Sequence, residues 1–259
     1  MANNKASSVN RSTVKAMRLI EYISVQPHAV RLSELANALN INKSTASRFL
    51  AALQQENYVT QDNNQRYRLT YKICSISNRF LSNSQHRDII HPYLVELTNK
   101  IGESCCVSIP QNLSMVYIDV VAGPDRALMT MQKVGSTAPM HCTANGKLVL
   151  SRMSENDIDH YIEKKGLTKF TKNTIDTKEK LLKALEEIRD QGFAYDNEES
   201  EDGNVCIASP IFDYTGKIFG SIAFTGPKVR INRAFIRKHL SSLKETAARI
   251  SADLGYNNK

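Results

Sequence analysis

Two short amphipathic segments that meet at an abrupt turn constrain the fold of this chain more than any other feature. The first covers residues 31–39, has apolar side chains on one face, and is expected to be capped by Ser33. Asn40 follows, and asparagine tolerates the left-handed backbone conformation better than most residues with a side chain. The second segment covers residues 43–53 and repeats the apolar stripe. The pattern predicts a helix, a tight turn and a second helix.

The second of these helices has a basic and hydroxyl-rich face near its N-terminus, opposite the apolar stripe. The side chains on that face are Lys43, Ser44, Thr45, Ser47 and Arg48. A DNA major groove about 12 Å wide admits a helix, where hydroxyl groups and lysines bind phosphates and an arginine reaches guanine edges. We therefore expect this helix to be the recognition helix of a DNA-binding helix-turn-helix.

Two short strand-like runs follow the helical pair and predict a β-wing. They cover residues 58–60 and 66–70 and are separated by the polar turn 62–65. Arg66 and Arg68 alternate along the second run, where they would contact the phosphate backbone. A small helical domain with a solvated basic face and no DNA partner is the alternative, and the wing favours the DNA-binding interpretation.

The distribution of charge along the chain supports the same interpretation. The formal net charge is +8, and residues 1–72 hold 10 lysines and arginines against 4 acidic residues, a balance of +6. Residues 73–259 hold 24 against 22, a balance of only +2. This asymmetry indicates a head that binds a polyanion, followed by a nearly neutral body.

Several other classes of protein are not indicated. No apolar run approaches the roughly 18–20 residues of a membrane-spanning helix, and residues 1–8 lack the apolar centre of a secretory signal. We expect a cytoplasmic protein with no membrane partner. The five cysteines include no CxxC pair, and the common nucleotide-binding and hydrolase motifs do not occur.

The remainder of the chain alternates helix-like and strand-like runs. Helices are predicted over residues 71–82, 88–101 (with Pro92 in the first turn), 141–150, 155–164, 178–191 and 233–254. Strands are predicted over 105–109, 115–121, 128–131, 207–212 and 217–224, with a loop over 135–140 and a hairpin through 213–216. This order favours an α+β domain in which helices flank a mostly antiparallel sheet. Cys105 and Cys106 should point to opposite faces of that sheet.

Particular stretches of the chain resemble the IclR-type transcriptional regulators. In the head these are residues 32–36, 42–50 and 66–69, which resemble the family's winged helix-turn-helix. In the body they are residues 102–103, 134–135, 139–147, 196–199 and 203–211, which resemble its GAF-like effector-binding domain. The resemblance implies a winged helix-turn-helix over 10–72, a linker helix over 73–86 and an effector-binding domain over 87–257.

The resemblance also implies a function and a set of partners. Such regulators are dimers or tetramers that bind a double-stranded DNA operator and sense a small organic acid, without a cofactor. Most repress a catabolic operon, although activators of the same architecture exist. A metabolite-binding protein whose head contacts another protein is the alternative from a different class.

The resemblance places the effector over one face of the sheet. The matching positions are Thr130, Ala138, Ala144, Asn145, Asp196, Asn204, Cys206, Ala223 and Thr225. A helix that opens near residues 143–145 would offer free backbone N–H groups to a carboxylate, and the alanines would leave room for a ligand. Asn145 stands where the family often has a small residue. Alanine and cysteine are also often simply buried, so an ordinary core is the alternative.

Two further alternatives involve the cysteines. Cys206 with His141 would make a nucleophile and base, and Cys142 with both would make a metal site. No motif brings these three residues together, so we expect neither catalysis nor a bound metal.

Overall fold

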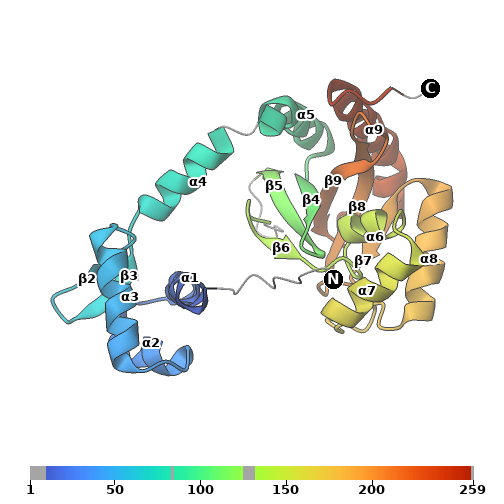
Figure 1. Cartoon of the computed structure of the whole chain (residues 1–259). Coiled ribbons are helices and arrows are strands. Elements are labelled where there is room, and N and C mark those ends of the chain that lie inside the picture. Colours follow the sequence, from blue (N-terminus) through green and yellow to red (C-terminus); the bar gives the residue numbers. More distant parts are fainter. Residues whose placement is uncertain (1–9, 83–84, 125–131, 258–259) are drawn as a thin grey trace, which may run out of the picture. The chain divides into compact units, whose positions relative to one another are not determined.

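The computed structural model describes residues 10–82, 85–124 and 132–257 (Figure 1). The chain divides into two compact units between residues 84 and 85, here called the head and the body, and each is described by itself. Both units combine helices with antiparallel strands, so the α+β class is confirmed. In the described part of the chain, no helix is long and apolar enough to cross a membrane.

The head is a winged helix-turn-helix. Its elements are α1 (Arg11–Ser24), β1 (Val30–Arg31), α2 (Leu32–Ala38), α3 (Lys43–Gln55), β2 (Val59–Gln61), β3 (Arg66–Leu69) and α4 (Lys72–Ser82). The strands form an antiparallel sheet in the order β1-β3-β2, which adds the unpredicted strand β1 to the wing. Leu19, Leu35 and Leu50 are fully buried where α1, α2 and α3 meet.

Asparagines and short-range hydrogen bonds determine the turns and the helix starts of the head. Asn40 has a φ of 49°, as the turn between α2 and α3 requires. The Asn42 side chain caps α3 by accepting a hydrogen bond from Thr45 N at 2.8 Å. The prediction that Ser33 caps α2 is wrong, because the helix already begins at Leu32. Instead Arg31 N donates to Glu34 Oε2 at 2.8 Å, and the pairing of β1 with β3 fixes where the helix starts.

The body is built on a six-stranded antiparallel sheet in the order β6-β5-β4-β9-β8-β7. Its strands are β4 (Ser104–Gln111), β5 (Ser114–Val121), β6 (Thr137–Ala138), β7 (Ala194–Asn197), β8 (Asn204–Phe212) and β9 (Ile218–Pro227). Its helices are α5 (Gln85–Ile101), α6 (Ala144–Leu150), α7 (Glu155–Lys165), α8 (Lys178–Gln191) and α9 (Arg233–Asp253). The predicted hairpin through residues 213–216 joins β8 to β9.

Two predictions about the body are wrong, and a third concerns residues outside the described ones. Pro92 lies in the interior of α5 because the helix begins at Gln85, three residues before the predicted start. The predicted loop over 135–140 contains the short strand β6, which pairs with β5. The predicted strand over 128–131 lies outside the described residues.

Helices cover both faces of the body sheet (Figure 1). One face packs against α5 and α9, and the other packs against α6, α7 and α8. Cys105 belongs to the first core and Cys106 to the second, so these neighbours do point to opposite faces.

Gly146 allows α6 to pack closely against the segment before it. A Cβ atom at position 146 would lie 2.2 Å from Met140 Cα and 2.4 Å from Met140 O, which no side chain tolerates. This close approach fixes α6 above the sheet, and with it the neighbouring Ala144 and Asn145.

Candidate functional site

The polar face of α3 is presented to solvent as the sequence predicts. Lys43, Ser44, Ser47 and Arg48 are exposed, whereas Thr45 is half-buried. Ser44 Oγ donates to the capping Asn42 Oδ1 at 3.0 Å, so one of these hydroxyls already has a partner within the helix cap. Among the described residues, Lys43 and Arg48 have no ion pair, so this face offers two cations and the exposed hydroxyl of Ser47 at the N-terminal half of α3.

The wing adds a further basic residue that sequence reasoning missed. Arg68 is exposed and Arg66 is half-buried, both on the side of β3 away from the buried Tyr67. Arg31 on β1 stands directly opposite Arg66, and like charges in that position repel each other unless an anion lies between or above them. The only sequence signal for this pairing was the lone Val30–Arg31 pair before α2, which is too short to predict a strand.

A hollow of about 360 Å³ connects the wing with the start of α3. It is lined by Arg31, Leu32, Ser33, Lys43, Asn64 and Gln65. Two cations and a hydroxyl-bearing side chain thus border one concave surface, next to the helix predicted to enter the groove. Such a surface suits a phosphate of the DNA backbone.

The body brings together eight of the nine residues predicted to bind an effector, here called the sheet-face set. They are Ala138, Ala144, Asn145, Asp196, Asn204, Cys206, Ala223 and Thr225. Thr130 lies outside the described residues. Asp196, Cys206 and Thr225 pair across β7, β8 and β9, and all eight residues belong to the side of the sheet that α6 covers.

Asn145 is the least satisfied member of the sheet-face set. Its side chain is buried, and Nδ2 donates only a long contact of 4.0 Å to Cys106 Sγ. Asn145 Oδ1 is buried and has no hydrogen-bond partner among the described residues. A buried amide oxygen without a partner costs free energy, so this is the position where a hydrogen-bond donor of a ligand would gain most.

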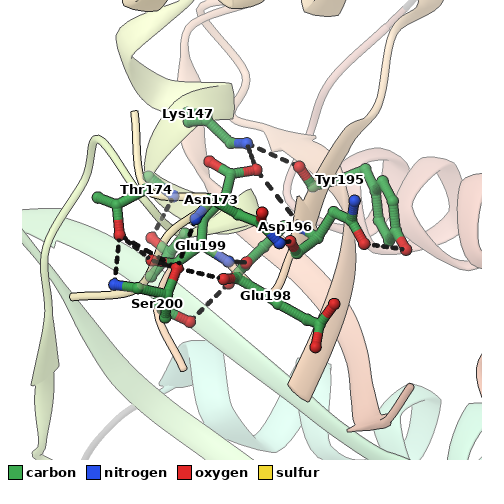
Figure 2. Close-up of polar contacts among 12 residues, drawn as sticks. Lys147, Asn173, Thr174, Tyr195, Asp196, Glu198, Glu199 and Ser200 are labelled. Atoms are coloured by element: carbon green, nitrogen blue, oxygen red, sulfur yellow. Dashed lines mark hydrogen bonds and ion pairs between the residues drawn. The ribbon is translucent and has the colours of Figure 1, made fainter. Parts of the chain in front are cut away.

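The other buried polar groups of this region form a connected network (Figure 2). Lys147 Nζ donates to Tyr195 O at 2.7 Å and pairs with Glu199 Oε1. Asp196 accepts from Glu199 N at 2.7 Å and from Ser200 Oγ at 2.6 Å. Burial raises the pKa of Asp196, although these two donors oppose the shift. Burial also raises the pKa of Glu199, against the opposing effect of Lys147.

His141 and Cys206 do not form a pair of base and nucleophile in the structure. His141 Nδ1 contacts Tyr161 OH and Nε2 contacts Thr168 O, each at 3.0 Å, so both ring nitrogens are engaged away from Cys206. Burial raises the pKa of the Cys206 thiol well above its usual value, which disfavours a nucleophilic thiolate. Among the described residues, no three His, Cys, Asp or Glu side chains, including Cys142, are grouped to hold a metal ion.

A cleft of about 620 Å³ lies beside the edge strand β7, and no member of the sheet-face set lines it. Its walls come from α8, β7 and the first turns of α9, and Lys147 and Glu199 contribute to its lining. A smaller pocket of about 170 Å³ includes Ala138 and His141. No pattern in the sequence predicts the larger cleft.

A winged helix-turn-helix with a basic recognition face, joined to a separate α+β body, defines a DNA-binding regulator. Two family models cover most of the chain: the IclR helix-turn-helix domain matches residues 12–63, and the bacterial transcriptional regulator IclR C-terminal domain matches residues 78–252. The chain belongs to the IclR family of transcriptional regulators.

Individual members of this family are similar to this chain along nearly its whole length. An uncharacterised HTH-type transcriptional regulator of Haemophilus influenzae is 34% identical and is matched over 96% of this chain and 94% of its own. The transcriptional repressor IclR of Escherichia coli is 28% identical over 89% and 85% of the two chains. The crystal structure of Thermotoga maritima IclR has a TM-score of 0.77 and 31% identity, covering 95% and 99%. These proteins are regulators, and the chain is accordingly not an enzyme.

One more distant structure contains a ligand. An IclR homologue from Microbacterium hydrocarbonoxydans in complex with 4-hydroxybenzoate has a TM-score of 0.79 and covers 94% of this chain and 98% of its own. At 17% identity this likeness shows the shared fold alone.

Proposed function

We propose that this protein is an effector-responsive repressor of a catabolic operon, which binds its operator through α3 and the wing. The observation that best supports operator binding is the exposed, basic N-terminal face of α3. It lies beside the hollow that Arg31 and Lys43 line. Ser44, Thr45, Ser47 and Arg48 read or position the groove, and Lys43, Arg66 and Arg68 bind phosphates. Arg31 joins the phosphate-binding group, since it stands beside Arg66.

The sheet-face set is proposed as the effector site, with a small organic acid as its ligand. The unpartnered Oδ1 of Asn145 supports this, because it would accept a hydrogen bond from a ligand hydroxyl. If the amide group is rotated by half a turn, its NH2 group would donate to a ligand carboxylate at the same place. The alanines at 138, 144 and 223 leave room beside it. The ligand of the Microbacterium homologue, an aromatic acid, agrees in chemical class. Differential binding to two arrangements of the heads would then change operator affinity.

The remaining assignments complete the proposal. Residues 10–72 act as the DNA-binding domain, 73–86 as a linker and 87–257 as the effector-binding domain. Two heads of a dimer, or of each pair in a tetramer, would contact half-sites about 34 Å apart in the cytoplasm. Activation instead of repression is the alternative within this architecture, and a head that contacts protein is the alternative outside it.

The test compares single variants of the head on an operator selected by the wild-type protein from a random duplex pool. Arg48→Ala should lower affinity by at least about tenfold and relax the preference at one base position, as measured by fluorescence anisotropy. Arg31→Ala and Arg68→Ala should weaken binding to all sequences and reduce the slope of log K against log salt by about 1 each.

Lys183→Ala is the matched control, because it removes an exposed cation from α8 of the body. It should leave affinity and salt slope unchanged. If Arg48→Ala behaves like this control, α3 is not the recognition helix. If the wild-type protein selects no duplex and binds DNA without salt dependence, the head contacts protein instead.

A further inference from the structure

The cleft beside β7 combines charged and apolar surface in a way that the proposed effector site does not explain. Three cations and two carboxylates line it, a net charge of +1: Lys147, Arg233, Arg237, Glu187 and Glu199. Five apolar side chains also line it: Ile175, Ala184, Ile188, Phe193 and Ile236. A volume of about 620 Å³ falls within the range of small-molecule sites.

The outer part of the cleft carries two arginines in an unfavourable arrangement. Arg233 and Arg237 are four residues apart, so they lie on the same face of α9, and both are exposed. Arg233 is the first residue of this 21-residue helix, where the helix dipole disfavours a cation. No carboxylate of the described residues lies within 4.0 Å of either guanidinium. A bound anion would relieve both the mutual repulsion and the unfavourable interaction with the dipole.

The inner part of the cleft carries a buried carboxylate with a free acceptor. The Glu199 side chain is only 10% exposed, and its Oε1 pairs with Lys147, which is 4% exposed. Glu199 Oε2 is buried and has no hydrogen-bond partner among the described residues. Figure 2 shows this asymmetry, with dashed lines reaching one carboxylate oxygen and none reaching the other. A ligand hydroxyl would supply the missing donor.

We infer that this cleft is a second small-molecule site, separate from the sheet-face set, which binds a carboxylate that has an apolar body and a hydroxyl group. The carboxylate pairs with Arg233 and Arg237, the body packs on the apolar wall, and the hydroxyl donates to Glu199. This inference does not depend on the proposed effector site, because the two share no lining residue.

Three related compounds test the two polar ends without altering Glu199. We expect 4-hydroxyphenylacetate to bind the full-length protein in a calorimetric titration, with a dissociation constant below about 1 mM. Phenylacetate lacks the hydroxyl and 4-methylphenol lacks the carboxylate, so each should bind at least about fivefold more weakly. Absence of binding by 4-hydroxyphenylacetate at about 10 mM, or equal binding of the three compounds, overturns the inference.

A pair of variants locates the binding. Replacing Arg233 and Arg237 together by glutamine should weaken 4-hydroxyphenylacetate at least about tenfold, and these exposed substitutions spare the core. Lys238→Gln removes a neighbouring exposed cation of α9 that does not line the cleft, and should change affinity by less than about twofold. If the double variant binds as well as Lys238→Gln, the compound occupies another place and the inference is wrong.

Discussion

The head and the body use charged residues in opposite ways. Every buried polar or charged side chain in the described residues belongs to the body, beginning at Thr98, and none belongs to the head. Lys43 of the head is exposed, whereas Lys147 of the body is buried and paired with Glu199. A head that meets a polyanion must keep its cations outside. The body instead holds polar groups in its interior, where the low local dielectric strengthens the hydrogen bonds and ion pairs between them.

Removing the cation of the buried Lys147–Glu199 pair should give the largest difference between the two units in the loss of stability. Lys147→Met leaves the Glu199 carboxylate buried without its cation, so the free energy of unfolding of the body should fall by about 3 kcal/mol. Urea unfolding measures this loss. Lys43→Met, an exposed change of the same kind in the head, should cost less than about 0.5 kcal/mol.

A double substitution separates the lost pair from lost packing. Lys147→Met with Glu199→Leu removes both charges, and should recover most of the stability that Lys147→Met loses. Equal costs for Lys147→Met and Lys43→Met would contradict the contrast between inward and outward charge.

The sequence predicts the head better than the body because the head's signals are local. The turn at Asn40 and the cap of α3 each depend on residues within a few positions, and the structure confirms a helix start at Lys43. The wrong prediction that Ser33 caps α2 and the failure to predict a strand at Arg31 have one cause. Strand β1 is two residues long and exists only because β3 returns to pair with it.

In the body, the decisive contacts join residues that are distant in sequence. Lys147 meets Glu199 across 52 positions, and no periodicity of either segment predicts that they pair. The start of α5 was missed because Pro92 resembles a first-turn proline, whereas packing of α5 on the sheet sustains the helix on both sides of it. Resemblance to a family predicts the sheet-face set as an effector site, but it does not predict the cleft beside β7.

Turns provide a second contrast between the units, with a smaller expected effect. All 11 glycines lie at residue 102 or beyond, so the head makes its left-handed turns with other residues, including Asn40. Asn40→Ala should destabilise the head by about 1 kcal/mol, since alanine lacks a local hydrogen bond to compensate a positive φ. Asn40→Gly should be neutral or slightly stabilising, as measured by thermal unfolding.

Asn63→Ala is the control for the turn, because Asn63 is exposed at the wing tip and is not among the residues with positive φ. It should have little effect. An Asn40→Ala variant as stable as Asn63→Ala would mean that the turn between α2 and α3 relaxes to another conformation.

The smallest expected effect is a pH dependence of the stability of the body. Burial raises the pKa of Asp196 above its usual 3.8, so the folded protein binds this proton more tightly than the unfolded chain. The resulting stability is fully present below pH 3.8 and is lost as the pH rises through the folded-state pKa. Asp196→Asn should flatten this part of the curve of unfolding free energy against pH, because asparagine keeps an acceptor for Glu199 N and does not titrate. If Asp196→Asn leaves this part of the curve as steep as it is in the wild-type protein, the buried Asp196 carboxyl does not cause the pH dependence, and this part of the contrast between the two units is wrong.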